Sequence, residues 1–221
     1  MSKASITSIS MLSDLIAGLE NELQNPLPGK AGQVKMAPKP VNNTRFNFKH
    51  IENAKLGGVM ILLYPENGSV YFPLMERNKY PGVHSGQISL PGGKKENEDS
   101  DLMETAKRET NEEIGVPQDR MTVLGNLSEL YIEASNFRVL PSIGYVDSKP
   151  TFVEDSREVV NLFQVDIQEL INPNIRFTKQ MKVSKGLELD IPYFDIQGQM
   201  VWGATAMILS EFMTVLNRIK I

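Results

Sequence analysis

The 221-residue sequence predicts an α/β fold, specifically an α/β/α sandwich built on a mixed β-sheet. Apolar, β-favouring runs come in groups, with isolated helical segments between them, and this order is typical of a sheet covered by helices. The hydrophobic fraction of 41% is large enough for a core. The length suits one large domain with a small appendage. We therefore expect an N-terminal arm over residues 1–44 and one compact domain over residues 45–221.

The N-terminal segment predicts an amphipathic helix over residues 8–23, in which Leu12, Leu15 and Leu19 recur at helical spacing. The following stretch, "NPLPGKAGQVKMAPKPVNN", is rich in Pro, Gly and Asn and predicts an extended arm. The helix lacks the basic polar face of a membrane-surface helix. Its leucine stripe is expected to pack on the domain or on a second subunit, which leaves a homodimer open.

The compact domain begins with a predicted hairpin, "GGVMILLYPENGSVYFPLM", whose "PENG" supplies turn residues. A short strand, "QISL", and a polar loop, "PGGKKENEDS", lead into a helix that is capped by Asp99 or Ser100 and ended by Gly115. Later strands are expected in "MTVLGNLSELYI", "RVLPSIGYV", "EVVNLFQVD", "IRFTKQMKV" and "LELDIPYFDI", and helices in "IQELI" and "ATAMILSEFMTVLNRI".

Composition excludes several classes of site. The net charge of −4 argues against broad phosphate neutralisation, so no nucleic-acid partner is expected. The absence of cysteine excludes disulfides and thiolate metal sites. With no signal-peptide pattern and no apolar run of membrane length, we expect a cytoplasmic protein without a membrane partner. With only His50 and His84 present, a metal site must use mainly carboxylate and carbonyl oxygens, which suit Mg²⁺ or Mn²⁺.

The stretch "RETNEEIG" carries the candidate chemistry. Glu109, Glu112 and Glu113 fall within an arc of about 100° near the carboxyl end of a helix. The helix dipole and mutual repulsion both disfavour them there, so a positive group is expected beside them. Such carboxylates hold divalent cations on phosphate substrates, and one can accept a proton from an attacking water. Arg108 can orient a neighbouring carboxylate. The alternative interpretation is a solvated acidic helix face.

The segment "GGKKENEDSDLMETAKRETNEEIGV" resembles the Nudix box, the signature of hydrolases that cleave diphosphates linked to another group. The second half of the box is matched by Arg108, Glu109, Glu112, Glu113, Gly115 and Val116. Fourteen residues lie between Gly93 and Arg108, where the common box has thirteen, and Thr110 stands at a usually aliphatic position. The middle acid of the box is therefore either Glu98 or Asp99.

The lengthened box is similar to that of the coenzyme A pyrophosphatase branch. The upstream segment "PLMERNKYPGVHSGQISLPGG" matches that branch's motif through Arg77, Gly86, Pro91, Gly92 and Gly93. The branch's second arginine falls on Gly82 and its phenylalanine on Leu90. The segments "LPGKAGQVKMAP" and "WGATAMIL" also resemble this branch.

The resemblance implies a Nudix fold and metal-dependent hydrolysis of coenzyme A, or a derivative, into 3',5'-ADP and a 4'-phosphopantetheine compound. The implied metal ligands are Glu109, Glu112, Glu113 and the Gly93 carbonyl. Arg108, Glu109 and Glu112 are the implied catalytic residues, and which glutamate is the base stays open. Arg77, His84 and Gly92 are the implied substrate contacts, whereas Glu154 and Glu158 are expected to be solvated. The alternatives are an ADP-ribose or dinucleotide pyrophosphatase, and a non-catalytic nucleotide-binding Nudix module.

Overall fold

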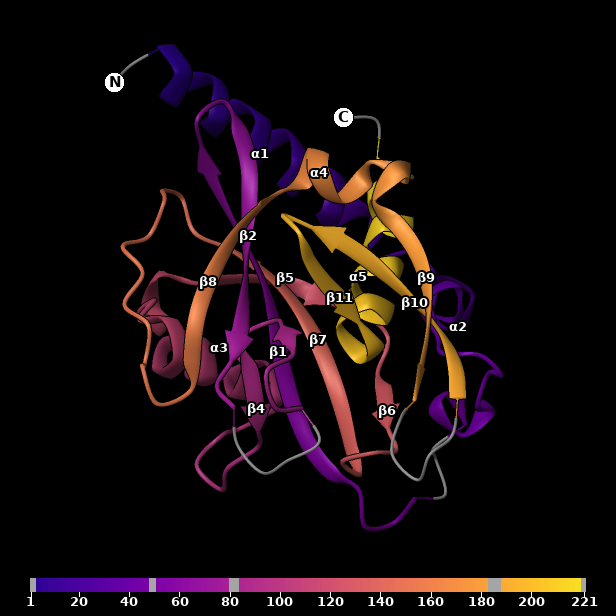
Figure 1. Ribbon diagram of the computed structural model, residues 1–221. Helices are drawn as coiled ribbons and strands as arrows, with labels where there is room; N and C mark the ends of the chain where they lie inside the picture. The colour runs from indigo at the N-terminus through magenta and orange to yellow at the C-terminus, as the bar shows by residue number, and fades with distance from the viewer. Residues whose placement is uncertain (1–2, 48–50, 80–83, 183–187, 220–221) are drawn as a thin grey trace.

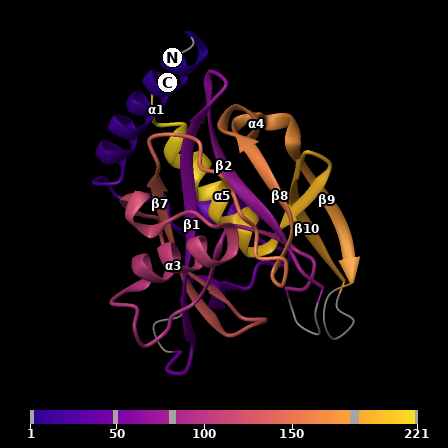
Figure 2. The same ribbon diagram turned by 90° about the vertical axis from the view of Figure 1, so that its left-hand side faces the viewer.

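The structure is a computed structural model that describes residues 3–47, 51–79, 84–182 and 188–219. A twisted sheet lies between helix α3 on one face and helices α1 and α5 on the other (Figures 1 and 2). The helices are α1 (Lys3–Glu22), α2 (Lys30–Gln33), α3 (Leu102–Ile114), α4 (Ile167–Ile171) and α5 (Gly203–Leu216), with short 3₁₀ turns η1 (Val34–Met36), η2 (Asn43–Phe46), η3 (Gln118–Arg120) and η4 (Pro173–Ile175). The strands are β1 (Lys55–Glu66), β2 (Ser69–Arg77), β3 (Ile88–Ser89), β4 (Gly92–Lys94), β5 (Thr122–Asn126), β6 (Leu130–Ile132), β7 (Phe137–Tyr145), β8 (Val159–Asp166), β9 (Arg176–Lys182), β10 (Glu188–Ile196) and β11 (Gln199–Trp202).

The main sheet is mixed because its central strand β1 pairs in both senses. Strand β1 runs parallel to β7, from Lys55↔Phe137 to Leu63↔Tyr145, and antiparallel to both β2 and β4. The order along the sheet is β3-β2-β1-β7-β5, with β8 paired to β2 and β6 to β7. The predicted mixed sheet and the predicted hairpin of β1 and β2 are therefore confirmed.

Alternation along β1 builds the two sides of the core. Ile61 and Leu63 join the apolar cluster that includes α1 and α5, whereas Met60 and Leu62 join the cluster beneath α3. Successive side chains of a strand point to opposite faces, so one apolar strand supplies both layers. This arrangement confirms the predicted α/β/α sandwich.

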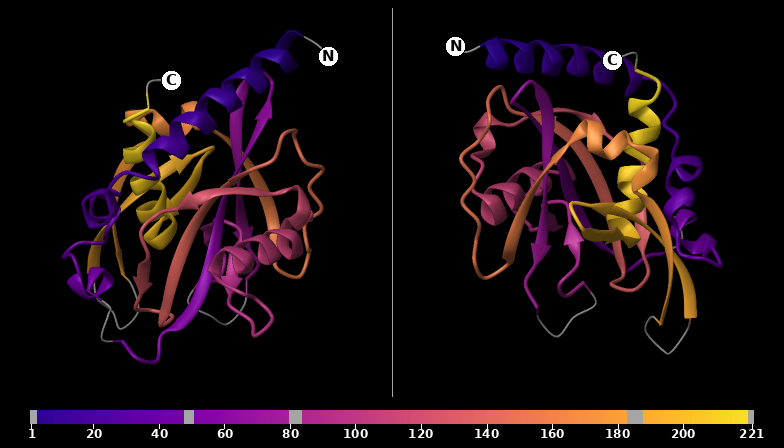
Figure 3. Two further views of the ribbon diagram at one scale, coloured as in Figure 1. Left: turned by 180° about the vertical axis from the view of Figure 1, so that it is seen from behind. Right: turned by 45° about the horizontal axis from the view of Figure 1, so that its top comes forward.

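The N-terminal segment packs on its own domain. Leu12, Leu15 and Leu19 of α1 are buried in the main core, and α1 lies across the end of the molecule at which the chain terminates (Figure 3). The predicted extended arm is wrong, because α2, η1 and η2 fold within it and α2 packs on α5. Gly32 permits the approach, since a Cβ there would lie 2.9 Å from the Glu211 Cα atom.

A second sheet of β9, β10 and β11 leads into α5. Strands β9 and β10 were expected, but β11 was not, because only four residues pair there. Strand β11 contacts β3 and so brings the start of α5 towards the glycine segment. The carboxyl-terminal part of the chain therefore helps to enclose the region around β3 and β4.

Glu211 of α5 anchors the N-terminal segment. Its carboxylate is buried and accepts hydrogen bonds from the Gly29 N–H (2.8 Å) and from Gln33 Nε2 (2.8 Å). Gln33 Nε2 also donates to the Ser128 carbonyl at 3.0 Å. Because buried polar groups are costly when unpaired, this network fixes the segment against α5.

We expect Glu211→Ala to lower the free energy of unfolding by about 2–4 kcal/mol, because the Gly29 and Gln33 donors lose their acceptor inside the protein. Urea denaturation followed by far-UV circular dichroism measures the loss. Glu188→Ala is the control, since Glu188 is an exposed partner of Lys182 and its removal should cost less than about 0.5 kcal/mol. Equal effects of the two substitutions would contradict an anchoring role for Glu211.

Candidate active site

The N-cap of helix α3 lies one residue after Ser100, the later of its two predicted caps. Asp101, and neither Asp99 nor Ser100, is the N-cap, and its side chain accepts from the N–H groups of Met103 (2.8 Å) and Glu104 (2.9 Å). Gly115 ends the helix with φ of 73°, as predicted. Asp99 therefore does not cap the helix, and its carboxylate accepts hydrogen bonds from Arg108 and Thr105 instead.

The glycine pair brings the main chain against this helix. Residues 92–94 were expected in a polar loop, but they form β4 and pair with β1. A Cβ atom on Gly92 would lie 2.3 Å from the Gly58 carbonyl oxygen, and one on Gly93 would lie 2.5 Å from the Glu109 carboxylate. A side chain at position 92 would therefore clash with β1, and one at position 93 would push the strand away from Glu109.

Glu113 is buried rather than part of an exposed carboxylate face. Its side chain is 1% exposed, and Oε2 accepts the Gly92 N–H at 2.7 Å. Oε1 makes no hydrogen bond to the described residues, although Arg77 Nη1 lies 3.3 Å away. Burial raises the pKa of Glu113 to about 8, and burial also raises the pKa of Glu109. Of the three glutamates only Glu112, with a side chain 55% exposed, is open to solvent.

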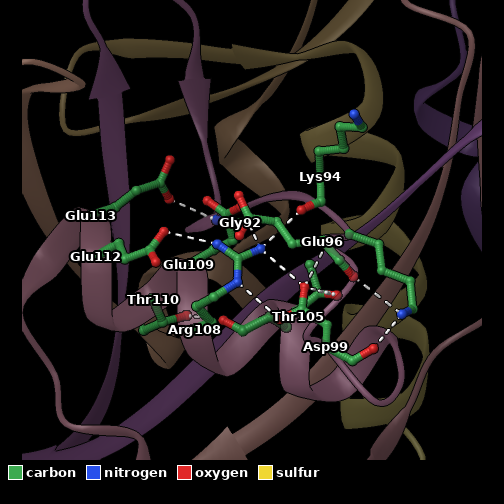
Figure 4. A network of polar contacts seen from close by, with 12 residues as sticks. Gly92, Lys94, Glu96, Asp99, Thr105, Arg108, Glu109, Thr110, Glu112 and Glu113 are labelled. Carbon is green, nitrogen blue, oxygen red and sulfur yellow. Dashed lines mark hydrogen bonds and ion pairs between the residues drawn. The ribbon is translucent and has the colours of Figure 1, made fainter.

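Arg108 is the positive group that the glutamate trio requires (Figure 4). Its Nη2 lies 3.0 Å from Glu109 Oε1, and its Nη1 donates to Glu112 Oε2 at 2.8 Å. Nη2 also donates to the Lys94 carbonyl at 2.9 Å. The expected contact of Arg108 with a neighbouring carboxylate is observed at Glu109, and the same guanidinium ties β4 to α3.

Asp99 is the acid that completes this network, and Glu98 is exposed. Arg108 Nε donates to Asp99 Oδ1 at 2.9 Å, and Thr105 Oγ1 donates to Asp99 Oδ2 at 2.9 Å. The hydrogen bond from Arg108 holds the pKa of Asp99 well below its usual range. Of the two candidate acids, Asp99 is therefore the one that binds Arg108.

A cavity of about 300 Å³ opens beside the glycine pair. Arg77, His84 and Gly92, the three predicted substrate contacts, all line it, while Gly82 lies outside the described residues. His84 Nε2 lies 3.0 Å from Ser135 Oγ, and His84 Nδ1 lies 3.1 Å from Gln87 Oε1. The predicted glutamates and the predicted substrate contacts are thus neighbours across β4.

Glu158 lies nearer the site than its expected solvated position implied. Its Oε2 is 4.0 Å from Arg77 Nη2, although its side chain remains 52% exposed. The loop before β8 is held against the end of α3, because Asp155 N–H donates to the Glu113 carbonyl at 2.9 Å. A prediction that β8 pairs with β2 would have placed Glu158 near Arg77, because Val159 lies opposite Arg77 in that pairing. Glu154 is exposed, as expected.

We expect Asp99→Asn to lower the free energy of unfolding by about 1–3 kcal/mol, because Arg108 loses a charged acceptor. Glu98→Gln, one residue away and exposed, should change it by less than about 0.5 kcal/mol. The folded-state pKa of Asp99 lies below its unfolded value, so its contribution is full above about pH 5 and declines as the pH falls below about 4. Denaturation curves from pH 3 to pH 7 test both points. A larger loss for Glu98→Gln would assign the middle acid to Glu98.

No helix among the described residues is long and apolar enough to cross a membrane.

Comparison with known proteins agrees with this geometry. The model of the NUDIX domain matches residues 55–183. A protein of Yersinia enterocolitica named "Uncharacterized Nudix hydrolase NudL" is 32% identical over 145 residues, which cover 65% of this chain and 73% of that protein. The NudL protein of Yersinia pestis strain Pestoides F is 32% identical over 136 residues, covering 62% and 67%. The crystal structure of the Mycobacterium smegmatis Nudix hydrolase RenU, 16% identical, superposes with a TM-score of 0.52 over 76% of this chain and 89% of that chain, which supports the fold. The chain belongs to the Nudix hydrolase family.

Proposed function

We propose that this Nudix hydrolase cleaves the pyrophosphate bond of coenzyme A or a derivative, giving 3',5'-ADP and a 4'-phosphopantetheine compound. The observation that carries the proposal is the cavity, which joins the branch-like segment from Arg77 to Gly93 to the glutamates of α3. Its wall combines apolar side chains, among them Phe137 and Ile208, with basic ones. Such a wall suits a ligand that carries a base, an apolar arm and phosphates.

The residues present fit a divalent cation, Mg²⁺ or Mn²⁺, held by Glu109, Glu112, Glu113 and the Gly93 carbonyl. The donors are hard oxygens, and Glu113 Oε1 is a buried carboxylate oxygen without a hydrogen bond to the described residues. Within the described ranges no three acidic or histidine side chains are already grouped as a metal site. Glu112 accepts a hydrogen bond from Arg108 Nη1 at 2.8 Å, and Glu109 lies 3.0 Å from Nη2 of the same guanidinium. Nudix hydrolases generally use divalent ions, whose role when bound is to offset the phosphate charge.

The side chains of this site have separable roles in the proposed reaction. Arg108 holds Glu109 and Glu112, and the Gly92 N–H orients Glu113. One glutamate accepts a proton from the attacking water, whose oxygen bonds to phosphorus as the bridging P–O bond breaks. Glu112 suits this role because its carboxylate is the exposed one. The two products are phosphate monoesters.

We expect Glu112→Gln and Glu113→Gln each to reduce turnover by at least about a hundredfold, because each removes a negative charge from the proposed metal site. Both variants should also bind Mn²⁺ more weakly, measured by the electron paramagnetic resonance signal of free Mn²⁺. Glutamine at 113 keeps an oxygen acceptor for the Gly92 N–H, so the fold should be retained and circular dichroism checks it.

Glu104→Gln is the control for these variants, since Glu104 lies on the same helix and pairs with Lys107 instead. A folded Glu113→Gln variant with near wild-type turnover and Mn²⁺ affinity would rule out the proposed metal site.

We expect coenzyme A to be hydrolysed faster than ADP-ribose or NADH at equal concentration, and only with Mg²⁺ or Mn²⁺ present. The physical reason is the extra phosphate of coenzyme A, which a basic cavity wall can bind. Mass spectrometry of the products, with and without chelator, is the measurement. Efficient release of AMP from ADP-ribose without 3',5'-ADP from coenzyme A would assign the protein to the alternative substrate class.

A further inference from the structure

We propose that Lys94 is the residue that determines selectivity for the 3'-phosphate of the substrate. This inference rests on the proposed function and names the contact that would distinguish coenzyme A from nucleotides without that phosphate.

The charged side chains among the described residues that line the cavity are basic. Three basic residues, Arg77, His84 and Lys94, line the cavity, and none of the described residues that line it is Asp or Glu. The Glu109 carboxylate lies on the other face of β4. A second anionic group, separate from a diphosphate near the glutamates, therefore meets only basic and neutral neighbours here.

Two of these basic residues already have partners. Arg77 lies 3.3 Å from Glu113 Oε1 and 4.0 Å from Glu158 Oε2, so its charge is balanced at the glutamate end of the cavity. Both ring nitrogens of His84 lie within hydrogen-bond distance of Gln87 or Ser135. Arg77, a predicted substrate contact, is thus better placed for the diphosphate.

Lys94 is the basic residue left for another anion. Its ammonium makes no ion pair or hydrogen bond with the described part of the chain, and Figure 4 shows it directed away from Glu112, Glu113 and Asp99. Its main chain is fixed, because Arg108 Nη2 donates to its carbonyl and the residue pairs with Gly57 of β1. The ammonium is therefore carried on a rigid support, which lowers the entropy cost of binding an anion.

Strand geometry explains the direction of this side chain. A Cβ on Gly93 would point into the Glu109 carboxylate, so that face of β4 is turned to α3. Lys94 is the next residue, and alternate residues of a strand point to opposite faces. Its side chain consequently leaves β4 on the side away from Glu109.

Ser89 supplies independent support for a ligand in this cavity. Ser89 lines the cavity, and its hydroxyl is buried with no hydrogen-bond partner among the described residues. Buried hydroxyls are normally paired, so an unpaired one in a cavity wall indicates a polar ligand atom. A phosphate or ribose oxygen fits this donor.

The test compares coenzyme A with 3'-dephospho-coenzyme A, which differs only in the 3'-phosphate. Wild-type protein should prefer coenzyme A by about tenfold or more in kcat/KM, as expected for a charge-assisted contact. Lys94→Met should lose about tenfold on coenzyme A, mainly through KM, and stay within about twofold on the dephospho substrate. Lys94→Arg should retain the preference. Lys107→Met removes the same charge from α3, where Lys107 pairs with Glu104, and should leave the preference unchanged.

A binding measurement separates failure of this inference from failure of the proposed function. Isothermal titration calorimetry with 3',5'-ADP and with 5'-AMP reports on the 3'-phosphate without hydrolysis. Tighter binding of 3',5'-ADP that Lys94→Met abolishes supports the inference even if coenzyme A is not cleaved, in which case the proposed function alone fails. Cleavage of coenzyme A with the same preference in wild type and Lys94→Met, or equal binding of the two nucleotides by wild type, overturns it.

Discussion

The hydrogen bonds of one guanidinium, that of Arg108, organise the site. Arg108 holds Asp99, the Lys94 carbonyl and two glutamates of its own helix, so the glycine strand and α3 cannot move independently. Its pKa is raised, chiefly by the hydrogen bond to Asp99, so it stays charged under all ordinary conditions. The helix dipole and the mutual repulsion of the carboxylates oppose this arrangement, and a fixed cation in their midst offsets both.

The same arrangement leaves Glu113 short of positive charge. It is buried, it receives one main-chain N–H and it has Arg77 beside one oxygen, yet burial still raises its pKa. Keeping this buried carboxylate ionised requires more compensation than these two partners supply. A divalent cation would provide that compensation, and this is why the geometry favours a metal site over a solvated acidic helix face.

Sequence reasoning predicted the elements whose signals are local. The apolar hairpin, the Gly115 helix end and the pairing of Arg108 with Glu109 follow from periodicity, backbone preference and the box spacing. It missed features that depend on distant contacts. The arm packs on α5, where Gly32 lies against Glu211, and Glu113 is buried where Gly92 and the loop before β8 contact the end of α3. Asp99 could not be chosen over Glu98 without knowing that Asp101 caps the helix.

Strand β4 divides the site electrostatically. Gly93 turns one face to the carboxylate of Glu109, while Lys94 extends from the other. Acidic groups that suit a cation therefore lie on the α3 side, and a basic, acid-free cavity lies beside them. Under the proposed function, a ligand with a diphosphate and a separate phosphate would use both regions at once, the diphosphate through a cation and the separate phosphate through Lys94. If both proposals hold, selectivity and hydrolysis depend on different residues, and a change at Lys94 alters the first without removing the second.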